Sequence, residues 1–510
     1  MSKIVGTSNE QHRLQKAIRG AQGMSPMDAL DEKINNATDA RANVINTQFD
    51  EDGTFRQIWN NGKPADECDR KAFITLDGNS KENDRETIGT HGIGNFNANA
   101  VIAGNGAVRV NSYDGETRHE LYIDFDKLAD QRQSPHDCWT GDHPHRPQWK
   151  EPTKDSGGYK IGVTQEFLGG SPCKHKFIFD EVVRHLYLKF DSFIQNGGCF
   201  NIKWGINTYP LDTPLYNREE MMEGSVDINI YKDPQSSSLS CYWYNETKGQ
   251  MRSGPNKTSG KNMCRKCTQT SSEEYVTKTE LRFNHPKLED IELDVSENLT
   301  NSGIAGYLSA EFINQGVQKI LNATIKKDDN QKWSLKLPCG YNINLDVTNS
   351  MHSQRVKPEI QAVLDLGIIP SIRIFNDDHI QAVKSDNDFD RNGAFSKGGD
   401  MGAKKFHVPV QFEWNNTPEK IFNLSQEDKN KVDFPEFLKR AILDIFKDTN
   451  NKIHNTLNQR YKEERKKYEE AAQALLEAQE AEAQALAEPQ ALAEAQAVAQ
   501  PAVEAQGAAQ

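Results

Sequence analysis

Glu32 and Asn36 are polar residues four positions apart in the stretch Ser25–Ala40. That spacing places both on one face of a helix, with Asp39 close to the same face. The carboxylate can orient and deprotonate a water, and the carboxamide oxygen suits the hard cation Mg²⁺. The pattern predicts a site for nucleotide hydrolysis, and the alternative is a solvated polar helix face.

The same stretch has the start signals of a helix. Ser25 can cap the first turn, Pro26 suits the first helical position, and Asp28 suits the positive end of the helix. We therefore expect a helix to begin at Pro26.

A strand that runs into a turn is expected at residues 58–64. Asn60 and Asn61 tolerate unusual backbone angles there, and Gly62 adopts them freely. Alone, this stretch predicts only a turn.

A glycine-rich stretch follows at residues 88–98, with Gly89, Gly92 and Gly94 ahead of a helical run. Glycines let backbone N–H groups approach a phosphate closely, and the start of a helix adds its positive end. The stretch is not a Rossmann fingerprint, because no strong strand leads directly into it with an acidic residue about twenty positions later.

Together and in this order, the three stretches resemble the nucleotide-binding boxes of the GHKL ATPase superfamily. That superfamily includes gyrase, topoisomerase II, heat-shock-90-type chaperones, histidine kinases and MutL, and the MORC family is closest in layout. Its first box reads Glu-x-x-x-Asn-Ala-x-Asp-Ala, and residues 32–40 match every fixed position.

The other boxes match with substitutions. Asn60 stands where most members have Asp, as in the topoisomerase II version, and Pro64 replaces the final glycine of that box. Residues 78–81 resemble the start of the ATP lid, one residue short before Lys81. The glycines of residues 89–94 match the third box.

The resemblance implies a role for each matching residue. Glu32 would be the general base and Asn36 would ligate Mg²⁺, while the Asn60 side-chain oxygen would contact the adenine amino group, with Asp77 as the alternative. The implied cofactors are ATP and Mg²⁺. The implied nucleotide-binding set is Asn36, Asp39, Asn60, Gly62, Lys81, Gly89, His91, Gly92, Ile93 and Gly94.

GHKL proteins carry a Gly-Thr pair on a later strand, and its threonine usually helps to bind adenine. Gly158 and Tyr159 occupy the corresponding place here. Tyr159 therefore replaces the threonine, and Thr164 is the residue that we expect to compensate.

A distant segment, residues 428–434, resembles the end of the transducer domain of MORC proteins. A lysine there reaches back to the γ-phosphate, and Lys431 is the matching residue, with Lys429 as the alternative. A cation at that position would stabilise transferred charge. A plain surface lysine has an equal claim.

Composition sets the broad class. The chain has 510 residues, 36% hydrophobic residues and a net charge of −13, which predicts a soluble globular protein of two or three domains. No apolar run approaches a membrane span, and residues 1–23 lack the apolar core of a signal peptide. The eight cysteines are then expected to be reduced thiols, and we expect an intracellular protein, cytoplasmic or nuclear.

The expected fold class is α/β (α+β), in four parts. Residues 1–23 form an N-terminal arm and residues 24–205 a GHKL-type two-layer α/β sandwich. Residues 206–455 form a transducer-like α/β domain. Residues 456–510 form a helical and then disordered tail, rich in Ala, Glu and Gln.

Local patterns predict the individual elements. Residues 62–72 are expected to form a polar loop, and Pro489 is expected to end the tail helix. Strands are expected at 44–49, 55–59, 101–112, 120–125, 201–204, 226–231 and 239–244, and helices at 177–194, 435–446 and 462–488.

A basic stretch without acidic residues follows three aromatic residues at positions 242–244. Basic side chains beside aromatic ones can hold phosphates and stack bases, so duplex DNA is a candidate partner, and the alternative is a solvated loop. The basic residues are Arg252, Lys257, Lys261, Arg265 and Lys266.

Two groups of metal-ligand residue types are weak candidates. Cys264 and Cys267 form a single Cys-x-x-Cys pair, and zinc needs two further ligands, of which Cys241 could supply only one. The second group matches no standard spacing, so we favour a surface insertion there; it comprises His136, Cys138, His143 and His145.

The expected function is slow Mg²⁺-dependent ATP hydrolysis that drives homodimerisation and a conformational change, in the manner of a clamp on DNA or chromatin. The alternatives are a chaperone-like ATPase that acts on protein clients and a nucleotide-binding scaffold with little turnover. Histidine kinase and complete topoisomerase activities are disfavoured, because we find neither a phospho-acceptor histidine domain nor an acidic Toprim-like motif.

Overall fold

The computed structural model describes most of the chain, with gaps. The described residues are 24–74, 94–104, 106–128, 147–169, 176–235, 238–246, 248–254, 274–301, single positions between 303 and 319, 321–327, 332–345, 371–376, 379–385, 411–415, 423–424, 432–433 and 436–499.

The first part is an eight-stranded mixed sheet in the order β5-β4-β3-β6-β2-β1-β7-β8. All neighbours are antiparallel except β1 and β7, which run parallel. The strands are β1 (Val44–Phe49), β2 (Phe55–Asn60), β3 (Ala107–Tyr113), β4 (Arg118–Asp124), β5 (Gln148–Trp149), β6 (Gly162–Leu168), β7 (Cys199–Trp204) and β8 (Asn207–Leu211).

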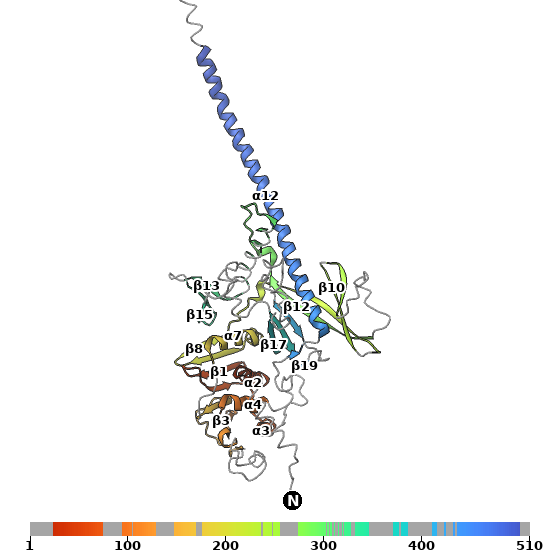
Figure 1. The fold of residues 1–510 in the computed structure, drawn as a ribbon. Helices are drawn as coiled ribbons and strands as arrows, with labels where there is room; N and C mark the ends of the chain where they lie inside the picture. The colour runs from red at the N-terminus through yellow and green to blue at the C-terminus, as the bar shows by residue number, and fades with distance from the viewer. Residues whose placement is uncertain are drawn as a thin grey trace, which may run out of the picture.

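Helices pack on one face of this sheet (Figure 1). Strand side chains alternate between the two faces, so Ile45 and Ile58 point to the same side and pack with Leu30 and Leu186 of the helices. The result is a two-layer arrangement, which confirms the predicted α+β class. The helices are α2 (Pro26–Asp39), α3 (Glu67–Ile74), α4 (Gly94–Ala103), α5 (Phe125–Leu128), α7 (Phe179–Lys189) and α8 (Asp191–Gln195).

The second part is built around a seven-stranded sheet in the order β11-β10-β9-β12-β18-β16-β17. A three-stranded sheet of β13 (Thr324–Lys327), β14 (Trp333–Lys336) and β15 (Asn342–Leu345) packs instead with the core of the first part, where Leu335 and Ile343 are buried. A two-stranded sheet comprises β19 (Asn423–Leu424) and β20 (Val432–Asp433). The strands of the large sheet are β9 (Met221–Lys232), β10 (Leu239–Asn245), β11 (Gln250–Gly254), β12 (Glu274–Pro286), β16 (Ser371–Asn376), β17 (His379–Ser385) and β18 (Gln411–Asn415), with short 3-10 helices η1 (Arg218–Glu220) and η2 (Leu288–Asp290) beside it.

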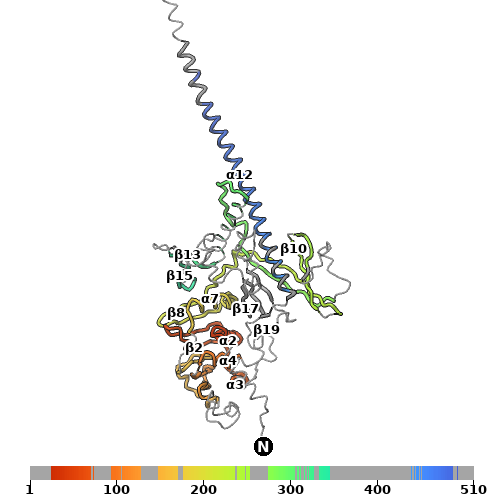
Figure 2. The backbone as a smooth tube through the Cα atoms, viewed as in Figure 1, coloured from red at the N-terminus to blue at the C-terminus, as the bar shows by residue number. Residues whose placement is uncertain are grey.

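One long helix, α12 (Glu436–Ala499), belongs to this second part. Its first turns bury Leu438 and Ile442 against Ile228 and Trp243 of the sheet, and its far end extends well beyond both sheets (Figures 1 and 2). Among the described helices, none has the length and apolar character needed to cross a membrane.

Three local predictions are wrong. Residues 62–72 do not form a continuous loop, because α3 begins at Glu67. The strand expected from residue 101 begins at Ala107, because α4 continues to Ala103. The tail helix does not end at Pro489: a proline removes one helical hydrogen bond, and the strong helix formers around it carry α12 on to Ala499.

Candidate functional site

Helix α2 begins as its sequence predicts. Ser25 Oγ accepts a hydrogen bond from the Asp28 backbone N–H at 3.1 Å, and Asp28 Oδ2 accepts one from the Ser25 N–H at 3.2 Å. This capping box fixes the first turn, and Pro26 occupies the start of the helix. The rotation of α2, and so the position of Glu32 and Asn36, is determined by the apolar residues that it buries.

The structure brings Glu32, Asn36 and Gly94 together. Glu32 is 8% exposed, and its Oε1 accepts a hydrogen bond from Asn36 Nδ2 at 3.4 Å. A Cβ added to Gly94 would lie 2.3 Å from Glu32 Oε1, so the carboxylate rests against the first residue of α4. The positive end of that helix therefore faces a buried carboxylate.

Gly94→Ala should therefore disturb the site, because the new methyl group occupies the place of the Glu32 carboxylate. We expect Glu32 to be displaced, and we expect the activity predicted from the sequence, Mg²⁺-dependent release of phosphate from ATP, to be at least tenfold slower than in wild type. A matched Ala100→Gly variant changes the same helix away from Glu32. The prediction fails if Gly94→Ala releases phosphate from ATP as fast as wild type does.

A buried lysine, Lys33, joins α2 to the same end of α4. Its Nζ donates to the Asn95 backbone oxygen at 3.0 Å and to the Oδ1 atoms of Asn95 and Asn99 at 2.5 Å each. Burial lowers the pKa of Lys33 to about 7, and the nearby charge of Glu32 acts in the opposite direction. No sequence pattern indicated this contact, although Lys33 comes directly after Glu32.

This lowered pKa predicts a pH dependence of stability. Between about pH 7 and the ordinary lysine pKa of 10.5, the unfolded chain keeps a proton that the folded chain has released. Stability contributed at this position should therefore rise as the pH increases from 7. We expect the urea midpoint of wild type to rise relative to that of Lys33→Met when the pH is increased from 7 to 9. A difference between the two midpoints that does not change with pH would contradict this.

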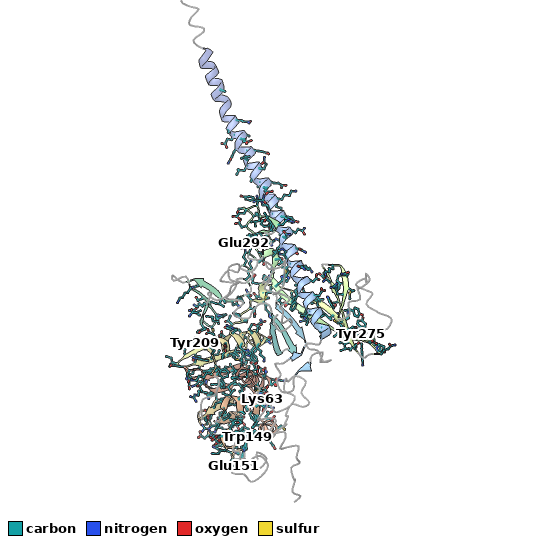
Figure 3. The ribbon with its side chains drawn as sticks, in the orientation of Figure 1. Lys63, Trp149, Glu151, Tyr209, Tyr275 and Glu292 are labelled. Carbon is teal, nitrogen blue, oxygen red and sulfur yellow. The ribbon has the colours of Figure 1, made fainter. Side chains whose placement is uncertain are left out.

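The turn after β2 lies at the end of α2. Asn60 is buried, and its Oδ1 accepts a hydrogen bond from the Gly62 N–H at 3.1 Å. The backbone N–H of Lys63, which is labelled in Figure 3, donates a hydrogen bond to the Ala40 backbone oxygen at 2.7 Å. The turn is thus tied to the C-terminal end of α2.

Buried polar side chains without partners lie on the helix-covered face beside Asn60. Thr47 and Gln165 stand on either side of Ile58 in the register of neighbouring strands. Among the described residues, Thr47 Oγ1, Gln165 Oε1 and Asn97 Oδ1 have no hydrogen-bond partner. Buried polar atoms are normally paired, so this layer could hydrogen-bond a polar ring.

Sequence reasoning missed Gln165 and Thr47. The alternation of Val163, Gln165 and Phe167 on one face of β6 was the signal that could have identified Gln165, because its two neighbours on that face are apolar. Thr47 occupies the same kind of position between Ile45 and Phe49.

The adenine contacts that we expected on strand β6 are wrong in two respects. Strand β6 begins at Gly162, so Gly158 and Tyr159 precede it, and the Tyr159 hydroxyl donates to Glu166 Oε2 at 2.9 Å. Thr164 pairs with Trp59, which places it on the opposite sheet face from Asn60. Thr164 therefore cannot compensate for the missing threonine.

The residue beside Asn60 is Val163, next to Gly162. Gly162 has φ +116°, and a Cβ on it would lie 1.9 Å from the Asn60 backbone oxygen. A glycine is therefore required at this point of the sheet.

Several predicted site residues lie outside the described residues, so the structure places none of them; they are Asp77, Lys81, Gly89, His91, Gly92, Ile93, Lys429 and Lys431. The same is true of Lys257, Lys261, Cys264, Arg265, Lys266, Cys267 and the cluster His136, Cys138, His143 and His145. Asp39 lies in the last turn of α2, partly buried.

Arg252 is the described member of the basic stretch. It lies in β11, and its Nε is 3.5 Å from Asp444 Oδ2 of α12. No cluster of three or more His, Cys, Asp or Glu residues that could hold a metal occurs within the described ranges.

No protein-family model matches the chain, and no curated protein sequence matches it. Among solved structures, the chain is similar to the N-terminal domain of a DNA repair protein, with 11% identity and a TM-score of 0.36. That similarity covers 86% of this chain and 94% of the other.

Proposed function

We propose that the chain binds Mg²⁺-ATP beside α2 and α4 and slowly hydrolyses the γ-phosphate. The observation that carries this proposal is the buried Glu32 carboxylate, which lies against Gly94 at the start of α4 and one helical turn from Asn36. A general base, a carboxamide and a helix N-terminus at one place form a site suited to phosphate chemistry. The match of residues 32–40 to the first GHKL box supports the same proposal.

Each residue has a stated task. Glu32 orients and deprotonates the attacking water. Asn36 uses Nδ2 to contact Glu32, so its Oδ1 points elsewhere and suits a hard cation. Bound Mg²⁺ would neutralise charge on the phosphates. The positive end of α4 would attract the same phosphates, and the backbone N–H groups of the glycines at 89 and 92 would also contact them.

The adenine ring of ATP would contact Asn60 and its polar neighbours. Because the Gly62 N–H can only donate, the Asn60 atom that accepts from it is Oδ1. That oxygen keeps a second lone pair for an adenine amino group. Gln165 and Thr47 add buried polar atoms on the same sheet face.

We further propose that ATP binding favours a homodimer and that duplex DNA is the partner on which the dimer acts. The support is the resemblance to MORC and MutL proteins and the basic stretch that begins at Arg252. A protein client is the competing partner.

The test is phosphate release from ATP with Mg²⁺, by wild type and by Asn36→Ala, with and without duplex DNA. We expect Mg²⁺-dependent release by wild type, loss in Asn36→Ala, and stimulation by DNA. Turnover without DNA stimulation would refute the DNA clamp and leave the ATPase. Absence of both ATP binding and release would refute the proposed function itself.

A further inference from the structure

The face of the first sheet that carries no helices forms a polar groove. Its floor is made by side chains that stand in two rows across neighbouring strands. One row runs through Lys203, Gln48 and Gln57, and the next through Asn201, Asn46, Trp59 and Thr164. The groove encloses about 300 Å³, at the lower end of the range for small-ligand sites.

The charged side chains that line the groove are all positive. Lys160 and Lys203 line it and are exposed, and no carboxylate is among its described lining residues. The nearest acidic side chain in the rows, Glu166, is already engaged by Arg109 at 3.3 Å and by the Tyr159 hydroxyl at 2.9 Å. Two ammonium groups on a protein of net charge −13 mark this groove as a place for an anion.

The uncharged lining residues favour a ligand rich in hydroxyl groups. Four carboxamides, each both donor and acceptor, belong to Asn46, Gln48, Gln57 and Asn201. Asn201 Nδ2 already donates to Asn46 Oδ1 at 2.9 Å, so these groups are held in place across β7 and β1. Such an array is fit to hydrogen-bond the vicinal hydroxyls of a sugar.

An aromatic ring completes the groove. The Lys160 ammonium lies 5.2 Å from the centre of the Trp59 ring, on its face. Trp59 Nε1 is buried, and it has no hydrogen-bond partner among the described residues. If the long Lys160 side chain turned toward an anion, it would uncover a face of the Trp59 ring for the ligand.

We propose that this groove binds a ribose-phosphate unit. The phosphate contacts Lys160 and Lys203, the sugar hydroxyls contact the carboxamides, and the attached ring packs on Trp59. This site lies on the opposite sheet face from Asn60, so it is separate from the proposed ATP site. The unit can come from a free nucleotide or from a single strand of nucleic acid, because both contain it.

The test measures binding of a fluorescein-labelled oligouridylate and its displacement by AMP or ribose 5-phosphate. The protein is the full chain carrying Asn36→Ala, which removes the proposed Mg²⁺ ligand of the ATP site, and the measurement is made without Mg²⁺. The groove variant adds Lys160→Ala and Lys203→Ala. A matched variant with the same change in charge adds Lys127→Ala and Lys176→Ala, both surface lysines outside the groove.

We expect the groove variant to bind the oligonucleotide at least about tenfold more weakly, and the matched variant to bind as its parent does. Displacement by AMP would identify free nucleotides as a source, and binding of the strand without such displacement would identify nucleic acid. The proposal is wrong if both variants weaken binding equally, if neither ligand binds, or if neutral maltoheptaose binds and the groove variant does not alter it.

Discussion

Glu32→Gln is expected to lower the rate of phosphate release from ATP by about 10²- to 10⁴-fold, the usual contribution of a general base. Glutamine has nearly the same shape, so it fits against Gly94, where a larger side chain would not. It also keeps an oxygen that can accept from Asn36 Nδ2. The variant removes only the ability to take a proton from water.

Two measurements separate a chemical from a structural effect. The affinity for ATP, from equilibrium dialysis, should remain within a few-fold of wild type, and the melting temperature should not fall. The matched control is Glu151→Gln, since Glu151 is an exposed residue near the short strand β5 (Figure 3). If Glu32→Gln keeps the wild-type rate, Glu32 is not the base, whatever else binds at the site.

The sequence predicted the parts of the site that depend on local signals. The cap at Ser25, the pairing of Glu32 with Asn36, and the strand that ends at Asn60 all arise from short-range patterns, and the structure has them. The sequence analysis missed a local signal for helix α3, namely Asp66 directly before its first residue. In the structure Asp66 Oδ1 accepts a hydrogen bond from the Asp69 N–H at 2.9 Å and so caps the helix.

The remaining features depend on partners far along the chain. The parallel pairing of β1 with β7 joins residues that are more than 150 positions apart, and no local pattern encodes it. The contact between Glu32 and Gly94 and the bonds from Lys33 to Asn95 arise because α2 and α4 pack side by side. Gln165 Oε1 has no hydrogen-bond partner among the described residues, and its position beside Ile58 follows only from the register of β6 with β2.

Asp31→Asn is expected to lower the free energy of unfolding by about 3–5 kcal/mol, the usual cost of breaking a buried ion pair by removing one partner. Asp31 is 1% exposed on α2, and it accepts from the ammonium of Lys189, which is 4% exposed on α7. Its other oxygen lies 2.5 Å from His185 Nε2. Asparagine keeps the size but leaves the buried Lys189 charge without its carboxylate.

The sign of the pH dependence is set by the same contacts. Burial acts to raise the pKa of Asp31, but His185 and Lys189 outweigh it and hold this pKa below its ordinary value of 3.8. The stabilisation is therefore present above about pH 4 and is lost as the pH falls through the lowered pKa. Urea unfolding at neutral pH and near pH 3 should show the gap between wild type and Asp31→Asn narrowing in acid.

The matched control for this experiment is Asp52→Asn, which removes a carboxylate that pairs with Lys176 at the surface, where water and salt screen the charges. We expect a much smaller loss for Asp52→Asn than for Asp31→Asn. Equal losses in the two variants would mean that burial of the Asp31 pair contributes nothing, and that α2 and α7 are held together by their apolar contacts alone. Because Glu32 comes directly after Asp31 on α2, a loosened α2 should also reduce phosphate release, and this links the stability of the fold to the proposed chemistry.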